Sequence, residues 1–208
     1  MPDSASTASR TGTGADLRRL ILDHTRHLLV TGGYERVSMR KIARGVGCSA
    51  TSIYLHFESK DTLTHELIDE GMRKLYADLS AARDREDAPA RQLAALSHAY
   101  VRFGLDNPEY YQVMFQLHPE RMARYPADDY RRARRNIELF GEALSAGVER
   151  GLLTVATTPD VAAAALWTSL HGLVSLHLAE RVDVRVAGDE FIEAAVAQAL
   201  RAFSPAAG

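Results

Sequence analysis

Apolar residues recur at helical spacing along almost the whole chain. The first such stretch covers residues 16–31, and a longer one begins after Ser59 and continues to about residue 83. Apolar positions three and four residues apart form one stripe on a helix, and such a stripe packs against a core. The same spacing predicts further helices over residues 90–105, 108–117, 128–150, 159–180 and 189–203. No convincing strand pattern separates them, so we predict an all-α protein of about nine helices.

Between the first and the long helix, capping residues and glycines predict two short helices of about two turns each. Ser38 stands where an N-cap belongs, and Gly45 and Gly47 end the helix that follows it. Ser49 is the N-cap of a second short helix that continues through Tyr54. Two short helices joined by a tight glycine-containing turn describe a helix-turn-helix, whose second helix enters the major groove of DNA.

The charge of the chain is unevenly distributed. Residues 1–60 hold nine Lys and Arg against five Asp and Glu, a net charge of +4. The rest of the chain holds 16 basic against 22 acidic residues, a net charge of −6, so the whole chain carries −2. A basic first segment on an acidic body indicates that only the first segment meets a polyanion.

The second short helix and its flanks carry side chains suited to DNA. The helix begins with Ser49, Thr51 and Ser52, whose small hydroxyl side chains allow close approach to phosphates and base edges. Tyr54 and His56 follow and supply hydrogen-bond donors. Positive charge for the phosphates, which dominates affinity for DNA, comes from Arg40, Lys41, Arg44 and Lys60. Each residue alone is more often an ordinary surface or packing residue, and it is their combination that favours DNA binding.

Residues 16–63 resemble the DNA-binding domain of TetR-type transcriptional regulators. The resemblance rests on the pattern Ser38-x3-Ile42-Ala43-x3-Gly47-x-Ser49-x4-Tyr54-x2-Phe57-x2-Lys60-x2-Leu63. It implies a core that contains Ile42, Ala43, Ile53 and Phe57. It also implies phosphate contacts for Tyr54 and Lys60 and base contacts for Ala50, Thr51, Ser52 and His56. Motif and resemblance together predict the DNA-contacting residues Ser38, Arg40, Ser49, Ala50, Thr51, Ser52, Tyr54, His56 and Lys60.

Two features depart from the common pattern of this family. Cys48 stands where valine is frequent, and we expect it to act as a small buried hydrophobe. The recognition helix starts without Arg or Gln, so bidentate readout of guanine has to come from elsewhere, with Arg40 as one candidate. The operator sequence therefore does not follow from these residues.

The C-terminal part resembles a TetR subgroup with a Trp-x-x-x-His-Gly signature, here Trp167 to Gly172. Residues 107–115 resemble the middle region of the same subgroup. In this family a helical C-terminal domain dimerises and binds a small effector. The resemblance thus implies a homodimeric repressor that an apolar or aromatic effector releases from a palindromic operator. The apolar faces of the last two helices suit a two-fold four-helix interface, although they also fit a monomer core.

Aromatic and soft side chains in the C-terminal part are spaced to enclose an effector. Besides Tyr100, the predicted pocket residues are Phe103, Tyr110, Tyr111, Met114, Phe115, Phe140, Trp167 and His171. Each of them, taken alone, is more often a core residue than a pocket residue. For His171 in particular, a hydrogen-bonded core position and a pocket position both stay open.

The sequence shows no set of residues suited to bind a metal ion or to catalyse a reaction, so we expect that the protein is not an enzyme. His171 and His177 are six residues apart, so on a helix they point about 120° away from each other and cannot chelate one ion together. A partner from another helix, such as His98 or His118, stays open. The single Cys48 excludes an internal disulfide, and the sequence contains no nucleophile elbow and no dinucleotide fingerprint after a strand. We expect no metal and no cofactor.

These observations divide the chain into three parts. Residues 1–14 are expected to form a disordered leader without a secretory signal, residues 15–62 the helix-turn-helix domain, and residues 63–208 a helical effector-binding and dimerisation domain. Polar residues interrupt the most apolar run, over 161–179, so we expect no membrane span and a cytoplasmic protein. The alternative is an all-α ligand-binding protein or enzyme in which the helix-turn-helix is incidental.

Overall fold

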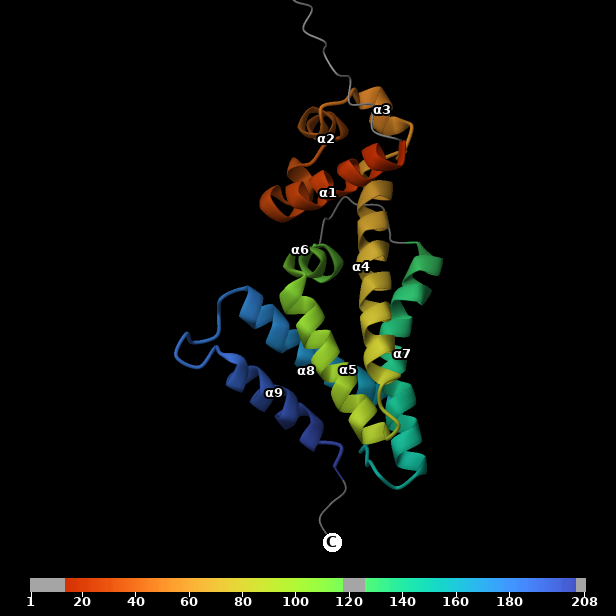
Figure 1. Cartoon of the computed structure of the whole chain (residues 1–208), viewed down its shortest axis with the longest axis vertical. Helices are drawn as coiled ribbons and strands as arrows, with labels where there is room; N and C mark the ends of the chain where they lie inside the picture. Colours follow the sequence, from red (N-terminus) through yellow and green to blue (C-terminus); the bar gives the residue numbers. More distant parts are fainter. Residues whose placement is uncertain (1–13, 118–125, 205–208) are drawn as a thin grey trace, which may run out of the picture. The chain divides into compact units, whose positions relative to one another are not determined.

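The computed structural model describes residues 14–117 and 126–204, and in these residues it contains nine α-helices and no strand (Figure 1). The helices are α1 (Gly14–Gly32), α2 (Met39–Val46), α3 (Ala50–Tyr54), α4 (Lys60–Arg83), α5 (Pro89–Asp106), α6 (Pro108–Tyr111), α7 (Ala127–Glu149), α8 (Pro159–Leu178) and α9 (Asp189–Arg201). The predicted fold class and the predicted number of helices are therefore confirmed.

The structure differs from the expected helices at three places. The segment predicted as one helix over 108–117 is a single α-helical turn followed by a π-helical turn, Gln112–Gln116. Hydrophobic spacing over so few residues does not distinguish the wider π turn from an α turn. A 3₁₀ turn at Tyr34–Arg36 was not predicted. The proposed leader lies outside the described residues except for Gly14, which is the first residue of α1.

The first compact unit contains residues 14–67, with α1, α2, α3 and the start of α4. Its core contains the four residues that the family resemblance implied, since Ile42, Ala43, Ile53 and Phe57 are 0–4% exposed. Burial of one such aliphatic or aromatic side chain contributes about 1.5–3 kcal/mol to the free energy of unfolding. These residues thus fix how the two short helices pack on α1.

The turn between α2 and α3 depends on Gly47. Its φ of 78° lies in the left-handed region that glycine adopts without steric strain. Its N–H donates to Ala43 O and closes the last turn of α2. Cys48 follows in the same turn and is only partly buried, so the expectation of a buried hydrophobe is wrong. A turn residue has no helix packed over it, and solvent therefore reaches the thiol.

A close approach of α1 and α2 depends on Gly45. The imidazole of His24 occupies the space that a Cβ at Gly45 would need. At this point the imidazole of His24 on α1 therefore packs directly against the backbone of Gly45 on α2. Gly45 is required by packing and not by its own backbone conformation, because it lies inside the α2 helix.

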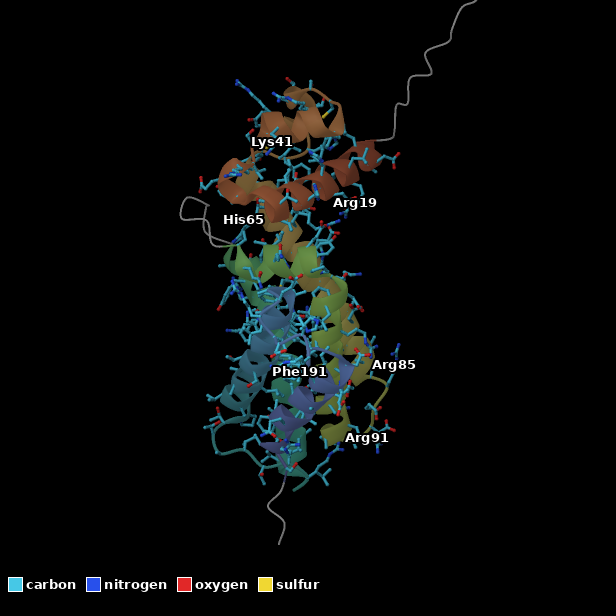
Figure 2. The ribbon with its side chains drawn as sticks, turned by 90° about the vertical axis from the view of Figure 1, so that its left-hand side faces the viewer. Arg19, Lys41, His65, Arg85, Arg91 and Phe191 are labelled. Carbon is cyan, nitrogen blue, oxygen red and sulfur yellow. The ribbon has the colours of Figure 1, made fainter. Side chains whose placement is uncertain are left out.

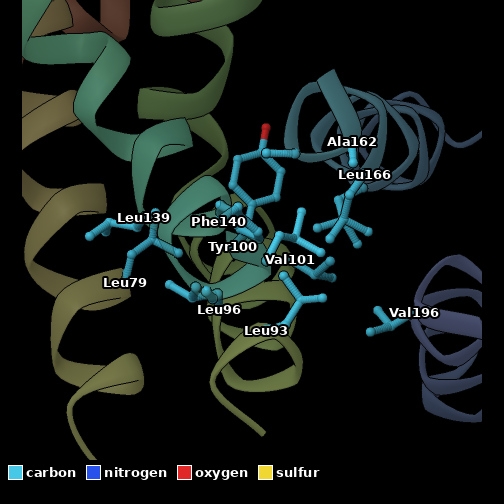
Figure 3. Close-up of a cluster of buried hydrophobic side chains, with 14 of the residues drawn as sticks. Leu79, Leu93, Leu96, Tyr100, Val101, Leu139, Phe140, Ala162, Leu166 and Val196 are labelled. Carbon is cyan, nitrogen blue, oxygen red and sulfur yellow. The ribbon is translucent and has the colours of Figure 1, made fainter. Parts of the chain in front are cut away.

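The second compact unit contains residues 68–116 and 126–204, and its core joins residues of six helices, α4 to α9. Figure 3 shows its centre, in which the labelled side chains are Leu79 on α4, Leu93, Leu96, Tyr100 and Val101 on α5, Leu139 and Phe140 on α7, Ala162 and Leu166 on α8, and Val196 on α9. All ten are buried. The apolar stripes predicted on these helices thus meet in one core.

The link between α4 and α5 is polar, as its composition predicts, and ion pairs anchor its two ends. Arg83 donates to Glu142 on α7 at 2.9 Å, and Arg91 donates to Glu86 at 2.9 Å. Arg85 and Arg91 extend from this part of the chain in Figure 2. All of these groups are at the surface, where an isolated ion pair contributes little to stability.

Helix α8 is more apolar than the interrupted run 161–179 suggested. It has 20 residues and a mean hydropathy of 1.4, so by length and composition it meets the requirements of a membrane span. Apart from Asp160 in its first turn, the polar residues of α8 are Ser, Thr and His, which reduce the mean hydropathy too little to exclude a span. In the structure Leu166, Leu170 and Val174 of α8 are core residues of the second unit.

Candidate nucleic-acid interface and ligand cavity

The helix-turn-helix leaves every residue predicted to contact DNA at least partly accessible. Arg40, Ser49 and Thr51 are exposed, and Tyr54 keeps 54% of its surface accessible. The other residues of the predicted set are exposed or half-buried, namely Ser38, Ala50, Ser52, His56 and Lys60. A partner as large as DNA can therefore reach this surface.

Two of these serines also hold the short helices in place. Ser38 Oγ accepts the Lys41 N–H at 3.3 Å, and Ser49 Oγ accepts the Ser52 N–H at 3.0 Å. An N-cap of this kind is worth about 1 kcal/mol to the helix it starts. The hydroxyl of Thr51 makes no hydrogen bond within the ranges 14–117 and 126–204, so it is available to a phosphate or a base edge.

Positive charge in the first unit is concentrated on α2 and the turn before it. Arg36, Arg40, Lys41 and Arg44 are exposed, and none of them forms an ion pair with any described carboxylate. The arginines of α1 do have acidic partners. Arg19 and Arg26 pair with Asp23, and Arg18 pairs with Glu66. The hydrogen bond from Arg19 lowers the pKa of Asp23 below its ordinary value, because it stabilises the carboxylate.

The unpaired positive charge therefore belongs to α2 and not to α1. Figure 2 labels Arg19 on α1, which has a carboxylate partner, and Lys41 on α2, which has none among the described residues. An exposed cation without a carboxylate partner keeps its full attraction for a phosphate.

Lys60 is held by Tyr34, a contact that the sequence did not reveal. Its Nζ donates to Tyr34 O at 3.1 Å and lies 3.6 Å from the centroid of the Tyr34 ring. The Tyr34 hydroxyl donates in turn to Asp61. An ammonium group has three donors, so a Lys60 held in this way still has donors for a phosphate.

A largely apolar cavity of about 240 Å³ lies in the second unit. Its lining comes from α4, the π-helical turn, α7 and α8, through Met72, Leu75, Phe115, Tyr130, Ala133, Arg134, Asn136, Ile137 and Trp167. It is smaller than the roughly 300–1,000 Å³ typical of sites for drug-sized molecules. Its size and lining therefore suit a small, mainly apolar molecule.

Next to the cavity, rings from α5, α6, the π-helical turn and α8 form an aromatic cluster, which we define as Tyr100, Tyr111, Phe115, Trp167 and His171. The His171 ring stacks on Trp167 at a centroid distance of 5.1 Å and on Tyr111 at 5.4 Å. Tyr100 meets Trp167 edge-on at 6.5 Å. Such pairs contribute about 0.5–1.5 kcal/mol each beyond their buried area.

Both ring nitrogens of His171 have hydrogen-bond partners. Nδ1 lies 2.6 Å from the Tyr111 hydroxyl and 3.2 Å from the Tyr100 hydroxyl, and Nε2 lies 3.3 Å from Ser175 Oγ. Burial lowers the pKa of His171 and raises the pKa of Tyr111, so both groups are neutral at pH 7. Each ring nitrogen thus has a hydroxyl within hydrogen-bonding distance, and the tautomer of His171 sets which group of each pair donates.

Two sequence profiles match most of the chain. Residues 21–67 match the profile of bacterial regulatory proteins of the tetR family. Residues 93–201, more than half of the chain, match the profile of the tetracyclin repressor-like C-terminal domain. The chain belongs to the TetR family. The resemblance stated for the helix-turn-helix is thus confirmed, and it extends to the C-terminal domain.

Individual relatives of this TetR-family chain are distant. The HTH-type transcriptional regulator YobS of Bacillus subtilis (strain 168) is 25% identical over 105 residues, which cover 50% of this chain and 54% of YobS. The nucleoid occlusion factor SlmA of Haemophilus ducreyi is 28% identical over 76 residues, 36% of this chain and 38% of SlmA. The chain thus aligns with about half or less of these curated relatives.

A solved structure of a TetR-family regulatory protein from Rhodococcus RHA1 resembles the whole chain. Its TM-score is 0.75 at 23% identity, and the match covers 92% of this chain and 98% of that chain. At this identity the similarity establishes a shared fold.

Only two of the eight predicted pocket residues of this TetR-family chain, Phe115 and Trp167, line the cavity. Phe103, Tyr111 and Phe140 are buried in the core of the second unit. The remaining three residues do not line the cavity either. Tyr110 donates to Glu70, Met114 packs against Gly71, and His171 belongs to the aromatic cluster. Of the two positions that the sequence left open for His171, the structure favours the hydrogen-bonded core position.

Sequence reasoning missed Leu55 beside the recognition helix and seven of the nine residues that line the cavity, Asn136 among them. Leu55 directly follows α3 and is 81% exposed, which is unusual for a large apolar side chain. Its place between Tyr54 and His56 was the only available signal, and an apolar side chain there can contact a thymine methyl group. Asn136 lines the cavity from α7, and nothing in its local sequence distinguishes it from a surface asparagine.

Within the described ranges, no three His, Cys, Asp or Glu side chains lie close enough together to hold a metal ion. His98, considered above as a partner for the histidines of α8, has its Nδ1 3.5 Å from Glu193 Oε1. His118 lies outside the described residues.

Proposed function

We propose that this TetR-family chain is a sequence-specific, DNA-binding transcriptional regulator. One observation carries the proposal: the four exposed cations of α2 and its preceding turn have no carboxylate partner in the described chain, although the arginines of α1 do. Helix α2 packs against α3, on which the Thr51 hydroxyl makes no hydrogen bond to a described residue. Phosphate contacts then position the helix-turn-helix, and α3 reads base edges in the major groove. The cytoplasm is the place of this activity.

The test is a salt titration of DNA affinity. Arg40→Ala and Arg44→Ala are compared with Arg91→Ala, an exposed arginine of α5 in the second unit that serves as the control. DNA from the region upstream of the coding sequence is the probe, and a shuffled sequence of equal length is the competitor. Each lost phosphate contact is expected to reduce the slope of log affinity against log salt by about 0.9.

The outcome separates the proposal from its alternative. Equal affinity for specific and shuffled DNA, or equal losses in all three variants, contradicts sequence-specific recognition through α2. In that case the alternative remains, namely an all-α ligand-binding protein or enzyme with an incidental helix-turn-helix.

The chain acts as a homodimer through α8 and α9. One face of α8 is open and consists of small and apolar residues: Val161 and Leu176 are more than half exposed, and Ala165, Thr168 and Ser169 between them are exposed as well. A Cβ at Gly172 would meet no atom within 4 Å. Small residues allow two helices to approach closely, and a two-fold dimer matches a palindromic operator. In this dimer the second copy of the chain covers the exposed apolar face of α8, which contributes to the high mean hydropathy of the helix.

A small apolar or aromatic effector occupies the cavity and releases the repressor from DNA. The cavity wall includes Met72 and Leu75 of α4, and the same helix begins at Lys60, a predicted phosphate contact. A ligand that favours one position of α4 shifts the population away from the DNA-binding state. Addition of effector to the protein–DNA complex is therefore expected to release the DNA.

A further inference from the structure

Asn136 has a buried hydrogen-bond acceptor that no described residue uses. The side chain lies on α7, is 5% exposed and lines the cavity. Its Oδ1 is buried and accepts no hydrogen bond from residues 14–117 or 126–204. Buried amide oxygens are satisfied in the great majority of cases, so an unused one at a cavity wall points to a ligand.

The orientation of this amide follows from its other end. Asn136 Nδ2 donates to Ala133 O at 3.0 Å and to Met72 O at 3.4 Å, and it lies 3.8 Å from Met72 Sδ. A flipped amide would place Oδ1 against these two carbonyl oxygens, where it would find no donor. The side chain therefore presents an acceptor, and not a donor, as its unused group.

The charges around the cavity restrict the ligand further. Among the described residues, Arg134 is the one charged side chain of the lining, and its guanidinium donates to Glu138 at 3.1 Å. No carboxylate of the described residues lines the cavity, so a cationic ligand finds no counter-charge among them. A carboxylate ligand would bring a second acceptor to Asn136 Oδ1 and leave that oxygen without a donor.

We infer that the cavity binds a neutral, mainly apolar molecule with one hydrogen-bond donor, such as a phenol or an alcohol, and that this donor pairs with Asn136 Oδ1. The inference rests on the proposed function, in which this cavity holds the effector. The apolar body of the ligand lies among Met72, Leu75, Phe115, Ile137 and Trp167. The amide also bonds α7 to the Met72 carbonyl of α4, so a ligand at Asn136 acts where these two helices are joined.

Trp167 provides a direct readout of cavity occupancy. It lines the cavity and is the only tryptophan of the chain, so a change in tryptophan fluorescence reports on this site. Four probes share one apolar body: para-propylphenol, its methyl ether para-propylanisole, propylbenzene and para-propylbenzoate. The ether keeps the oxygen and loses the donor. Excitation at the red edge of tryptophan absorption avoids the phenol.

The expected result is that para-propylphenol binds about 5- to 100-fold more tightly than its methyl ether, because only the phenol satisfies the buried oxygen. In Asn136→Leu, which replaces the amide by an apolar group of similar size, the preference for the phenol is expected to disappear while propylbenzene still binds. Thermal unfolding of Asn136→Leu checks that the fold is intact.

Other outcomes overturn the inference in distinguishable ways. Equal affinities for phenol and ether in the wild-type protein, tighter binding of para-propylbenzoate, or a phenol preference that survives in a folded Asn136→Leu protein exclude the role of Asn136 but keep the cavity as an effector site. If none of the probes changes the Trp167 fluorescence, the cavity itself fails as an apolar ligand site, and the effector part of the proposed function fails with it. The salt titration of DNA affinity decides the DNA-binding part independently.

Discussion

Trp167 and His171 stack in the second unit with ring centroids 5.1 Å apart and an interplanar angle of 28°. The two residues lie one helical turn apart on α8, yet only Trp167 lines the cavity. His171 instead bonds to the hydroxyls of Tyr111 and Tyr100. The shared signature of tryptophan and histidine therefore contains one cavity residue and one half-buried, hydrogen-bonded residue, with different consequences for mutation.

We predict that His171 makes the stability of the protein depend on pH. Burial lowers the pKa of His171 in the folded state below the ordinary value of about 6.5. As the pH falls through that value, the unfolded chain therefore binds more protons than the folded chain. The contribution to stability is thus complete above pH 6.5 and is lost progressively below it. Denaturant unfolding between pH 5 and pH 8 is expected to show a weaker pH dependence in His171→Gln than in the wild type.

Comparison with another histidine variant controls for the remaining histidines. His98→Gln changes a histidine whose Nδ1 lies near Glu193 at the surface, so it should leave the low-pH loss of stability in place. An identical pH profile in the wild type and His171→Gln would show that this ring contributes nothing to the dependence.

Gly45→Ala is predicted to destabilise the first unit. The added methyl group needs the space that the His24 ring occupies, and overpacking of this kind costs about 1–3 kcal/mol of the free energy of unfolding. Gly32→Ala is the matched control, because a Cβ there meets only ordinary contacts, the nearest at 3.6 Å. Thermal unfolding followed by circular dichroism measures both changes.

A double variant decides whether the cause is this contact. His24→Ala removes the ring, and the combination with Gly45→Ala is expected to be more stable than the sum of the two single losses predicts. Simple additivity of the two changes would mean that the ring and the glycine do not interact.

Lys60→Met is predicted to weaken DNA binding and to reduce stability at the same time. Methionine keeps the apolar stem over Tyr34 but removes the charge and the donor to Tyr34 O. We expect a loss of about 1–2 kcal/mol in the free energy of unfolding and a salt slope of DNA affinity that is shallower by about 0.9. DNA binding as a function of salt and thermal unfolding measure the two effects separately.

Tyr34→Phe separates structure from DNA contact. It keeps the ring under the Lys60 ammonium and loses only the hydroxyl that donates to Asp61. The unfolding free energy should fall while the salt slope stays the same. A shallower slope in this variant would show that the Tyr34–Asp61 hydrogen bond is needed to hold Lys60 at its phosphate.

Gly172→Leu is predicted to disrupt the homodimer without unfolding the monomer. A Cβ at Gly172 has open space around it, and leucine has a higher helix propensity than glycine by about 0.8–1 kcal/mol. A large side chain on this face, however, prevents the close approach of a second α8. Sedimentation velocity is expected to show a monomer with wild-type helical content, and affinity for a two-half-site operator should fall.

Ala81→Leu serves as the control, because it adds the same kind of side chain at an exposed position of α4. It should remain dimeric. A dimer in Gly172→Leu would place the interface away from this face of α8.

Local interactions explain why the helix-turn-helix could be predicted in detail. Ser38 and Ser49 cap their helices through N–H groups three residues later, and Gly47 ends α2 through its own backbone conformation. These signals lie within a few residues of the structure they specify. The caps also set where α2 and α3 begin. They therefore help to determine which side of each short helix, with its predicted DNA-contacting residues, stays accessible.

The ligand site could be predicted only in part, because its lining comes from helices that are distant in the sequence. Phe115 and Trp167 were predicted and line the cavity, whereas Tyr111, Phe103 and Phe140 have the same aromatic character but lie in the core. Residue type indicates that a side chain will be buried. It does not indicate whether a neighbouring helix or an open space will face that side chain.

The sequence by itself determined the helices, their caps, the helix-turn-helix and the family, because each depends on residues that are neighbours in the chain. Only the tertiary structure decided that Lys60 lies on Tyr34, that His171 bonds to Tyr111 without lining the cavity, and that the buried Oδ1 of the lining residue Asn136 accepts no hydrogen bond from a described residue. Asn136 and its acceptor Met72 are 64 residues apart. Contacts over such separations follow from how helices pack against one another, and the local spacing of apolar and polar residues does not specify them.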